Sequence, residues 1–358
     1  MRIGIIGAGQ LGQMLGFAAR DLGVDVRFVD PSDHPPAAVC GQVIQSAFDD
    51  AVALVALADT CDVITYEFEN VPVTALQHIE GIAPVYPPAA ALRQSQDRLD
   101  EKQLFGKLAI PLSGYHAIES RDDMDAAAEN LGLPMVIKTR RFGYDGKGQF
   151  VARDAADLDA AWDELGGQPL IAEQWIAFDY EVSCIGVRNV GGEIAIYPLS
   201  QNVHSDGILR TSRSPVDAPE LAEKASDYVH RLLDHLDYVG VLALELFVTG
   251  DKLLANEFAP RVHNSGHWSI EASETSQFEN HLRAIMNLPL GSTASKGHAG
   301  MVNLIGEISE STRALKQGEL HDYGKTPRTG RKLGHITVVA DTAEQRDALV
   351  EIVNKTVT

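Results

Sequence analysis

The stretch GVLALELFVTGDKLLANEFAPRVHNSGHW, residues 240–268, combines a strand pair with a dense run of polar groups. Two largely apolar runs flank the turn sequence 250–252, which predicts a β-hairpin. With a three-residue loop, Glu245 would face Glu257 across the ladder. Two opposed carboxylates repel each other unless a positive charge lies between them. The hairpin therefore predicts a cation site.

The chemistry of that site follows from its oxygen atoms. Mg²⁺ is commonly bound by one or two carboxylates together with nucleotide phosphates. The apolar neighbours of Glu245 and Glu257 disfavour the alternative, two solvated strand positions. We predict these two glutamates as metal ligands, with Asn256 as a further neutral oxygen ligand.

A polar run follows the hairpin directly. Arg261, His263 and Asn264 lie within four residues, too polar and irregular for a core strand. An arginine can grip a planar oxyanion with two hydrogen bonds, and histidine and asparagine add neutral donors. The alternative is a solvated loop, but the position after the metal hairpin favours an anion site. His267 and Trp268 are assigned structural roles.

A glycine-rich loop lies in VIKTRRFGYDGKGQFVA, residues 136–152. Glycines let the backbone approach an anion, and successive amides can cradle phosphate oxygens. Lys138, on the preceding strand, would add a point charge. A plain glycine-rich hairpin is the alternative, and the order of residues is not that of a Walker loop.

A second glycine pattern lies in GIIGAGQLGQML, residues 4–15, where Gly7, Gly9 and Gly12 have G-x-G-x-x-G spacing. Asp30 ends the next strand-like run, where a nicotinamide enzyme would place its ribose-binding carboxylate. The pattern alone leaves open whether the loop binds NAD or another phosphate.

Two further groups complete the candidate sites. Four basic residues lie within 325–332, in a chain whose formal net charge is −20. They suggest an anionic substrate group, with a solvated surface run as an equally weighted alternative. Glu67 and Glu69 end a strand-like run, where open α/β sheets place ligands.

Composition narrows the function classes. The chain has 358 residues, 45% hydrophobic and 22% charged, which is typical of soluble globular proteins. The net charge of −20 argues against a nucleic-acid partner. No stretch approaches the roughly 18 apolar residues of a membrane span. Three cysteines without metal-ligand spacing favour a reduced, cytoplasmic setting.

The order of predicted elements indicates three domains of α/β and α+β type. Alternating strands and helices over 1–108 predict a Rossmann-like parallel sheet, ending in a long helical stretch, 89–109. Residues 109–180 predict a small α+β unit. Antiparallel strands and helices over 181–358 predict a third, α+β domain.

These features, in this order, resemble the ATP-grasp superfamily, in which two α+β units clamp a nucleotide under a glycine-rich loop. The segments GAGQLGQML, YEFENV, QDR, GYDGKGQ, QNVHSDGILR, NEFAPRVHNSGHW and RKLGHIT resemble the N5-carboxyaminoimidazole ribonucleotide synthetase family. The resemblance runs from residue 3 to beyond 335. One departure is Phe142, where the family usually has a further glycine before GYDG.

The resemblance implies an ATP-grasp fold, with 109–180 as the lid domain. It implies that the protein is an enzyme, an ATP-dependent carbon–nitrogen ligase of de novo purine biosynthesis. The enzyme would carboxylate 5-aminoimidazole ribonucleotide (AIR) with bicarbonate through carboxyphosphate. The alternatives are a nicotinamide-dependent dehydrogenase, a nucleotide sensor, and another ATP-grasp carboxylase or ligase. The dehydrogenase explains residues 4–30 but leaves the second glycine loop and the glutamate hairpin without a role.

The resemblance also implies site residues. The ATP ligands would be Arg98, Lys138, Gly143, Tyr144, Asp145, Gly146, Lys147, Gly148, Gln149, Glu173, Gln174, Trp175, Ile176, Glu181, His204, Asn256 and Glu257. Mg²⁺, as one ion or two, would be held by Glu245 and Glu257. Catalytic contacts to bicarbonate and carboxyphosphate would come from Arg261, His263, Asn264 and Lys138. The AIR ligands would be the amides of Gly9, Gln10 and Leu11, one of Glu67 and Glu69, and Tyr144, Asp145, Lys325, Arg331 and Lys332.

The implied partners are small molecules, with a homodimer as the assembly. The product would pass to the mutase of the same pathway.

Overall fold

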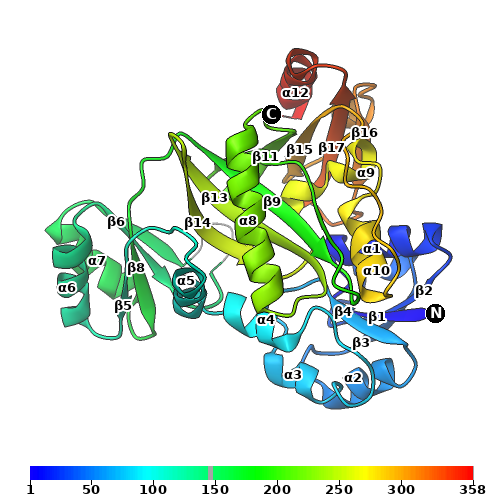
Figure 1. Ribbon diagram of the computed structural model, residues 1–358, viewed down its shortest axis with the longest axis horizontal. Helices are drawn as coiled ribbons and strands as arrows, with labels where there is room; N and C mark the ends of the chain where they lie inside the picture. Colours follow the sequence, from blue (N-terminus) through cyan, green and yellow to red (C-terminus); the bar gives the residue numbers. More distant parts are fainter. Residues whose placement is uncertain (144–147, 358) are drawn as a thin grey trace.

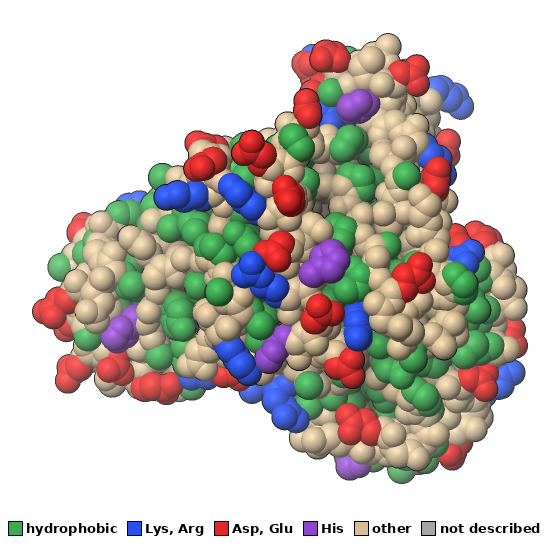
Figure 2. Space-filling model, in the orientation of Figure 1, with side chains coloured by type: hydrophobic (Ala, Val, Ile, Leu, Met, Phe, Trp, Pro, Cys, Tyr) green, Lys and Arg blue, Asp and Glu red, His purple; other side chains and the backbone are tan. Residues whose placement is uncertain are grey.

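The computed structural model describes residues 1–143 and 148–357. Three sheets organise the described chain, and Figure 1 shows one of them in a small lobe that projects from a larger body. Acidic side chains are scattered over every part of the face in Figure 2, with basic side chains between them. This distribution fits the net charge of −20.

The N-terminal sheet is parallel, in the order β3-β2-β1-β4. Its elements are β1 (Arg2–Ile6), α1 (Gln10–Asp21), β2 (Asp25–Asp30), η1 (Pro36–Val39), β3 (Gln42–Gln45), α2 (Ala51–Ala58), β4 (Val63–Tyr66) and α3 (Val73–Gln77). The predicted alternation of strands and helices is confirmed. A further expected strand at 83–87 is only a single bridge between Ile64 and Val85.

The long helix expected over 89–109 is wrong, because the chain breaks at Asp97. Two helices replace it, α4 (Ala89–Ser95) and α5 (Arg98–Lys107). Asp97 has an extended backbone, and its carboxylate accepts a hydrogen bond from the Leu99 amide at 3.0 Å. Arg140 donates to both oxygens of the same carboxylate, at 2.9 and 2.8 Å. This contact with Arg140, the residue after β6, fixes the new helix start, which helix propensity alone does not show.

The small lobe is a four-stranded antiparallel sheet, β5-β8-β6-β7, with two helices. Its elements are β5 (Tyr115–Ile118), α6 (Arg121–Leu131), β6 (Met135–Thr139), β7 (Gln149–Ala152), α7 (Ala155–Leu165) and β8 (Leu170–Gln174). Ser120 forms a capping box at the start of α6, and Asp154 caps α7. The lobe has its own apolar core, so it is a separate packing unit.

A nine-stranded sheet forms the body, in the order β14-β13-β9-β11-β12-β15-β17-β16, with β10 paired to β9. Its strands are β9 (Tyr180–Arg188), β10 (Ile194–Ile196), β11 (Ser200–Ser205), β12 (Ile208–Ser214), β13 (Gly240–Thr249), β14 (Lys252–Ala259), β15 (His298–Ile305), β16 (Glu319–Asp322) and β17 (Lys332–Ala340). Its helices are α8 (Pro219–His235), η2 (Asn264–Gly266), α9 (Ser269–Ala272), α10 (Gln277–Ile285), α11 (Glu310–Arg313) and α12 (Ala343–Val357).

The hairpin β13–β14 confirms the predicted pairing of the glutamates but not the predicted loop. Thr249 pairs with Lys252, so the turn has two residues rather than three. The register then shifts by one residue at Asn256, and Glu245 faces Glu257. The β-bulge places one extra residue, Asn256, on β14. This residue compensates for the shorter turn, so Glu245 and Glu257 still face each other.

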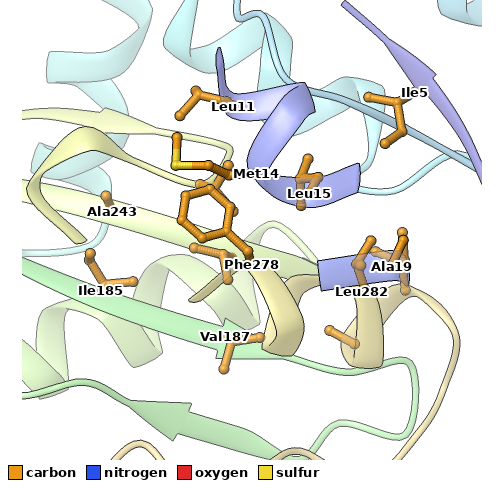
Figure 3. Packing of buried hydrophobic residues seen from close by; sticks show 14 of the residues in the cluster. Ile5, Leu11, Met14, Leu15, Ala19, Ile185, Val187, Ala243, Phe278 and Leu282 are labelled. Carbon is orange, nitrogen blue, oxygen red and sulfur yellow. The ribbon is translucent and has the colours of Figure 1, made fainter. Parts of the chain in front are cut away.

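Helix α8 covers one face of the large sheet, and α10 lies on the other together with α1 of the N-terminal unit (Figure 1). Figure 3 shows Leu11, Met14 and Leu15 of α1 packed near Phe278 and Leu282 of α10. The N-terminal and C-terminal units therefore share one hydrophobic core. This shared core holds the loop before α1 against the body.

Candidate active site

One face of α5 meets three consecutive residues of β14. Arg98 Nη1 lies 2.8 Å from Glu257 Oε2. Lys102 Nζ donates to the backbone carbonyl of Asn256 at 2.5 Å, and the backbone amide of Phe258 donates to Glu101 Oε1 at 2.7 Å. Positions 98, 101 and 102 are neighbours on a helix surface because they are three and four residues apart. Helix α5 therefore holds the bulged end of the hairpin.

The same helix joins the hairpin to the small lobe. Lys102 Nζ lies 3.3 Å from Glu173 Oε2 on β8, and Lys138 Nζ on β6 lies 3.1 Å from the other oxygen. The side chains of Lys102 and Glu173 are only 1% and 5% exposed, so their charges need each other. We call Arg98, Glu101, Lys102, Lys138, Glu173 and Glu257 the inner cluster.

Charges inside the inner cluster shift one another's pKa values. Burial opposes ionisation of Glu173, but Lys102 and Lys138 outweigh it and lower its pKa to about 2. Burial likewise opposes ionisation of Glu257, and Arg98 outweighs it to give a pKa of about 2. Burial raises the pKa of Glu101 to about 8. The inner cluster thus holds two firmly ionised carboxylates among three cations.

Glu245 and Glu257 suit a divalent cation. Each contacts a nitrogen donor on a different side: Arg98 Nη1 lies 2.8 Å from Glu257 Oε2, and His263 Nε2 lies 3.0 Å from Glu245 Oε1. Asn256 Oδ1, next to them, is buried and has no hydrogen-bond partner among the described residues. Within the described chain no three His, Cys, Asp or Glu side chains could hold a metal by themselves. A Mg²⁺ ion would therefore take further ligands from a bound nucleotide.

The polar run after the hairpin faces the N-terminal unit. Arg261 contacts Glu69 through two nitrogens, Nε at 3.0 Å and Nη2 at 2.5 Å, both to Oε2. The amides of Asn264 and Asn303 pair with each other, at 3.1 and 2.7 Å. His267 and Trp268 are buried and lie in the core, as predicted.

The predicted ATP ligands Glu181 and His204 lie together, and the segment 173–176, which the resemblance assigns to the adenine of ATP, begins at the end of β8. Glu181 Oε2 is 2.6 Å from His204 Nδ1. Burial opposes protonation of His204, but its hydrogen bond with Glu181 prevails and raises its pKa. Trp175 has 46% of its surface exposed, so a large apolar face just after β8 is open to contact with a ligand. Gln174 and Ile176 flank it, whereas Glu173 points into the inner cluster.

The N-terminal glycine loop is occupied by a carboxylate that the sequence analysis did not place there. Gly9 N donates to Glu67 Oε1 at 2.6 Å, and Gly12 N donates to Oε2 at 3.2 Å. A Cβ on Gly9 would lie 2.7 Å from Glu67 Oε1. The loop glycine therefore makes room for Glu67.

Asp30 argues against the dehydrogenase alternative. It is buried, and its two oxygens accept hydrogen bonds from the amides of Ala8 and Ser32, both at 2.8 Å. Its carboxylate thus stabilises the backbone around the glycine loop. It is not presented to a ribose in the way a dinucleotide site requires.

The predicted substrate residues from the two ends of the chain meet at this loop. Lys325, after β16, donates to the side chain of Gln10 at the start of α1. Burial and nearby Arg331 lower the pKa of Lys325 to about 8. Arg331 precedes β17, and Lys332 is its first residue. We call Gly9, Gln10, Glu67, Glu69, Arg261 and Lys325 the outer cluster.

Four predicted ligands, Tyr144, Asp145, Gly146 and Lys147, lie outside the described residues. Their neighbours Gly143 and Gly148 are described, and Gln149 begins β7. Gly148 has φ +69°, and a Cβ there would lie 2.7 Å from Thr139 Oγ1. This position requires glycine for both reasons.

Sequence reasoning missed Glu101, Lys102 and Asn303. The first two carry a signal, because their spacing from Arg98 puts all three on one helix face. Asn303 lies mid-strand in an apolar run, 39 residues from Asn264, and only the fold brings the two amides together.

Comparisons with known proteins agree along the whole chain. A family model described as the ATP-grasp domain matches residues 103–278. A model described as the ribonucleotide synthetase preATP-grasp domain matches 1–96, and one described as the phosphoribosylaminoimidazole carboxylase C-terminal domain matches 299–348.

Individual relatives match over nearly their full length. The chain is 47% identical over 355 residues to N5-carboxyaminoimidazole ribonucleotide synthase of Pseudomonas aeruginosa, covering 98% of each chain. The crystal structure of N5-carboxyaminoimidazole ribonucleotide synthetase from Thermus thermophilus has 46% identity and a TM-score of 0.95, covering 99% of this chain and 98% of that one. An Aspergillus clavatus structure in complex with ADP and AIR has 29% identity and a TM-score of 0.92, covering 99% and 98%. The chain therefore belongs to the N5-carboxyaminoimidazole ribonucleotide synthase family of ATP-grasp enzymes.

Proposed function

We propose how the residues of this site divide the work of the family's reaction, the ATP-dependent carboxylation of AIR in purine biosynthesis. Bicarbonate attacks the γ-phosphorus of ATP, and ADP leaves. The resulting carboxyphosphate transfers its carboxyl group to the 5-amino nitrogen of AIR, which loses a proton, and phosphate leaves. The products are N5-carboxyaminoimidazole ribonucleotide, ADP and phosphate.

The observation that carries this assignment is the position of the glutamate pair between Arg98 on one side and His263 on the other. Glu257 pairs with Arg98 of the inner cluster, and Glu245, opposite it, pairs with His263. The γ-phosphate and the bicarbonate would therefore meet at this pair, each beside its own donors. Phosphoryl transfer depends mainly on such positioning and charge neutralisation.

The inner cluster would bind the nucleotide. Lys138 and Arg98 contact its phosphates. Beside the inner cluster, Glu181 and His204 contact its ribose, and residues 174–176 contact its adenine. Mg²⁺, held by Glu245 and Glu257, neutralises phosphate charge when bound. The orphaned Oδ1 of Asn256 supports this site.

The outer cluster would bind AIR, and its Arg261 would bind bicarbonate together with His263 and Asn264. Lys325, with Arg331, Lys332 and the amides of Gln10 and Leu11, holds its phosphate. Because Glu67 already uses the Gly9 amide, we assign Glu67 to shaping the loop. Glu69, paired with Arg261, is then the glutamate nearer the carboxylation point.

From the resemblance we infer a homodimer, and consumption of the product by the mutase of the same pathway. From the cysteines we infer a cytoplasmic setting. Among the described helices, none combines the length and apolarity needed to cross a membrane.

The experiment is ADP formation measured with AIR, with bicarbonate, with both and with neither, always with Mg²⁺. We expect rapid ADP formation only with both substrates present, and none when Mg²⁺ is chelated. NADH turnover without AIR-stimulated ADP formation would overturn the assignment. Arg261→Lys serves as the site variant, because it keeps the charge but loses the planar fork. Its turnover should fall by about 10²-fold while its thermal stability is unchanged.

A further inference from the structure

His263 ends a buried chain of hydrogen bonds that the reaction scheme does not use. Asn202 Nδ2 donates to Ser183 Oγ at 2.9 Å, and Ser183 Oγ donates to Ser265 Oγ at 2.7 Å. Ser265 Oγ lies 2.8 Å from His263 Nδ1. The two serines have no exposed surface, and Asn202 is 4% exposed. Three secondary-structure elements, β11, β9 and η2, supply the links.

The chain has a direction because a hydroxyl has only one hydrogen to give. Ser183 receives from Asn202 and gives its hydrogen to Ser265. Ser265 then directs its own hydrogen toward His263 Nδ1. Asn202 is oriented in turn by Ser212, whose hydroxyl donates to Asn202 Oδ1 at 2.7 Å.

A second donor points at the same nitrogen. The backbone N–H of Ser265, which can only donate, lies 3.3 Å from His263 Nδ1. Nδ1 therefore accepts, and the ring of a neutral histidine carries its hydrogen on Nε2. Nε2 faces Glu245 Oε1 at 3.0 Å, the position where the proposed function places the bicarbonate group.

We propose that Asn202, Ser183 and Ser265 are positioning residues that fix the Nε2–H tautomer of His263. His263 then serves as a hydrogen-bond donor to the carboxyl group in transfer and cannot take the AIR amine proton at Nε2. The tautomer stands on the geometry alone, whereas the donor role rests on the proposed function.

The first test needs no variant and no substrate. Enzyme labelled with ¹⁵N-histidine is measured by NMR at mildly alkaline pH, and the His263 ring is assigned from the signals lost in His263→Asn. The couplings between ring nitrogens and ring protons should show a protonated Nε2 and a bare Nδ1. A protonated Nδ1 would overturn the proposal, whatever the enzyme catalyses.

The second test removes a link that touches no substrate. Ser183→Ala frees the Ser265 hydroxyl to accept instead of donate, so Nδ1 loses one of its two fixed donors and the Nδ1–H tautomer gains population. We expect kcat to fall about tenfold, since one hydrogen bond of about 1.4 kcal/mol is lost, with KM for ATP unchanged. Ser214→Ala is the matched control. It removes an equally buried hydroxyl on β12 that donates to the Leu199 carbonyl at 3.1 Å and takes no part in the hydrogen bonds that lead to His263.

The donor role has its own readout. His263→Gln keeps a donor but cannot act as a base, so it should retain at least tenfold more activity than His263→Ala. Equal activities would overturn the donor role. A Ser183→Ala enzyme with wild-type kcat and an unchanged tautomer would overturn the positioning role.

Discussion

The inner and outer clusters both join segments far apart in the sequence, but they satisfy their charges differently. In the inner cluster, cations and carboxylates pair directly between the hairpin, α5 and the small lobe. The outer cluster has one ion pair, between Arg261 and Glu69. Its other charged groups meet neutral partners: Glu67 accepts from backbone amides, and Lys325 contacts the neutral side chain of Gln10. The inner cluster is therefore held by mutual charge. The outer cluster is held by the shared core beneath α1 and α10.

This difference has a consequence for mutations. Removing one charge from the inner cluster leaves a buried partner uncompensated, so it should affect stability and nucleotide binding together. Changes in the outer cluster should affect AIR binding with little effect on the fold. The following predictions test this contrast.

The largest effect is expected for Glu257→Gln. The amide keeps the shape but removes one metal-binding charge and leaves Arg98 without its carboxylate. Turnover should fall on the order of 10³-fold, measured as ADP formation at saturating Mg²⁺. Thermal unfolding should show a lower Tm, because the Arg98 pair outweighs repulsion from Glu245. The control is Asp251→Asn, at the exposed turn of the same hairpin, which should change neither turnover nor Tm. Near-normal activity of Glu257→Gln would show that the hairpin does not bind the metal.

Lys102→Met tests whether α5 positions the hairpin. The change removes the contacts to the Asn256 carbonyl and to Glu173 while keeping the apolar stem. KM for ATP should rise by roughly ten- to a hundredfold, because the cost of an unpaired buried group is about 1–3 kcal/mol. KM for AIR should stay within about twofold.

The matched control for this change is Lys107→Met on the same helix, where the lysine is exposed. Its kinetics should equal those of the wild type. An equal rise in both KM values of Lys102→Met would show that the two clusters do not act separately.

Gly9→Asp tests the outer cluster. Its side chain would meet Glu67, since even a Cβ lies 2.7 Å from Oε1. KM for AIR should rise at least tenfold, because the carboxylate opposes the AIR phosphate and displaces Glu67. ATP affinity, measured by calorimetry without AIR, should be unchanged. Gly81→Asp, at a position with open space, is the control, and weaker ATP binding by Gly9→Asp would contradict the assignment.

The smallest effect is a pH dependence from Lys325. Burial and Arg331 lower its pKa to about 8, so the lysine is charged below pH 8 and neutral above it. If its charge binds the AIR phosphate, kcat/KM for AIR falls as pH rises through 8, by up to about tenfold per pH unit. Lys325→Arg stays protonated over this range, so its profile should remain flat there. Identical profiles for both enzymes would remove Lys325 from AIR binding.

Local sequence patterns predicted the parts of the fold that local chemistry determines. The alternation of strand-like and helix-like runs over 1–108 predicted the parallel sheet, and the two apolar runs around the turn at 250–252 predicted the hairpin. The break at Asp97 was not predictable in this way, because Arg140, 43 residues away, fixes it. The two-residue turn was missed for a similar reason: the compensating bulge at Asn256 is held by Lys102.

In the candidate site too, some features were predictable from the sequence and others depend on distant contacts. Family resemblance supplied the residues proposed to contact ligands, and the structure brings Gln10 together with Lys325, and Glu181 with His204. The contacts that hold these residues in place could not be read from the family resemblance. The hydrogen-bond chain behind His263 and the occupation of the Gly9 amide by Glu67 both depend on distant strands.

The most direct test of the central claim is the fate of the bicarbonate oxygens. The enzyme is run with ¹⁸O-labelled bicarbonate, AIR, ATP and Mg²⁺, and the phosphate released is examined by mass spectrometry. If bicarbonate attacks the γ-phosphorus between the two clusters, each phosphate carries one labelled oxygen. Unlabelled phosphate, formed while AIR is carboxylated, would contradict the account.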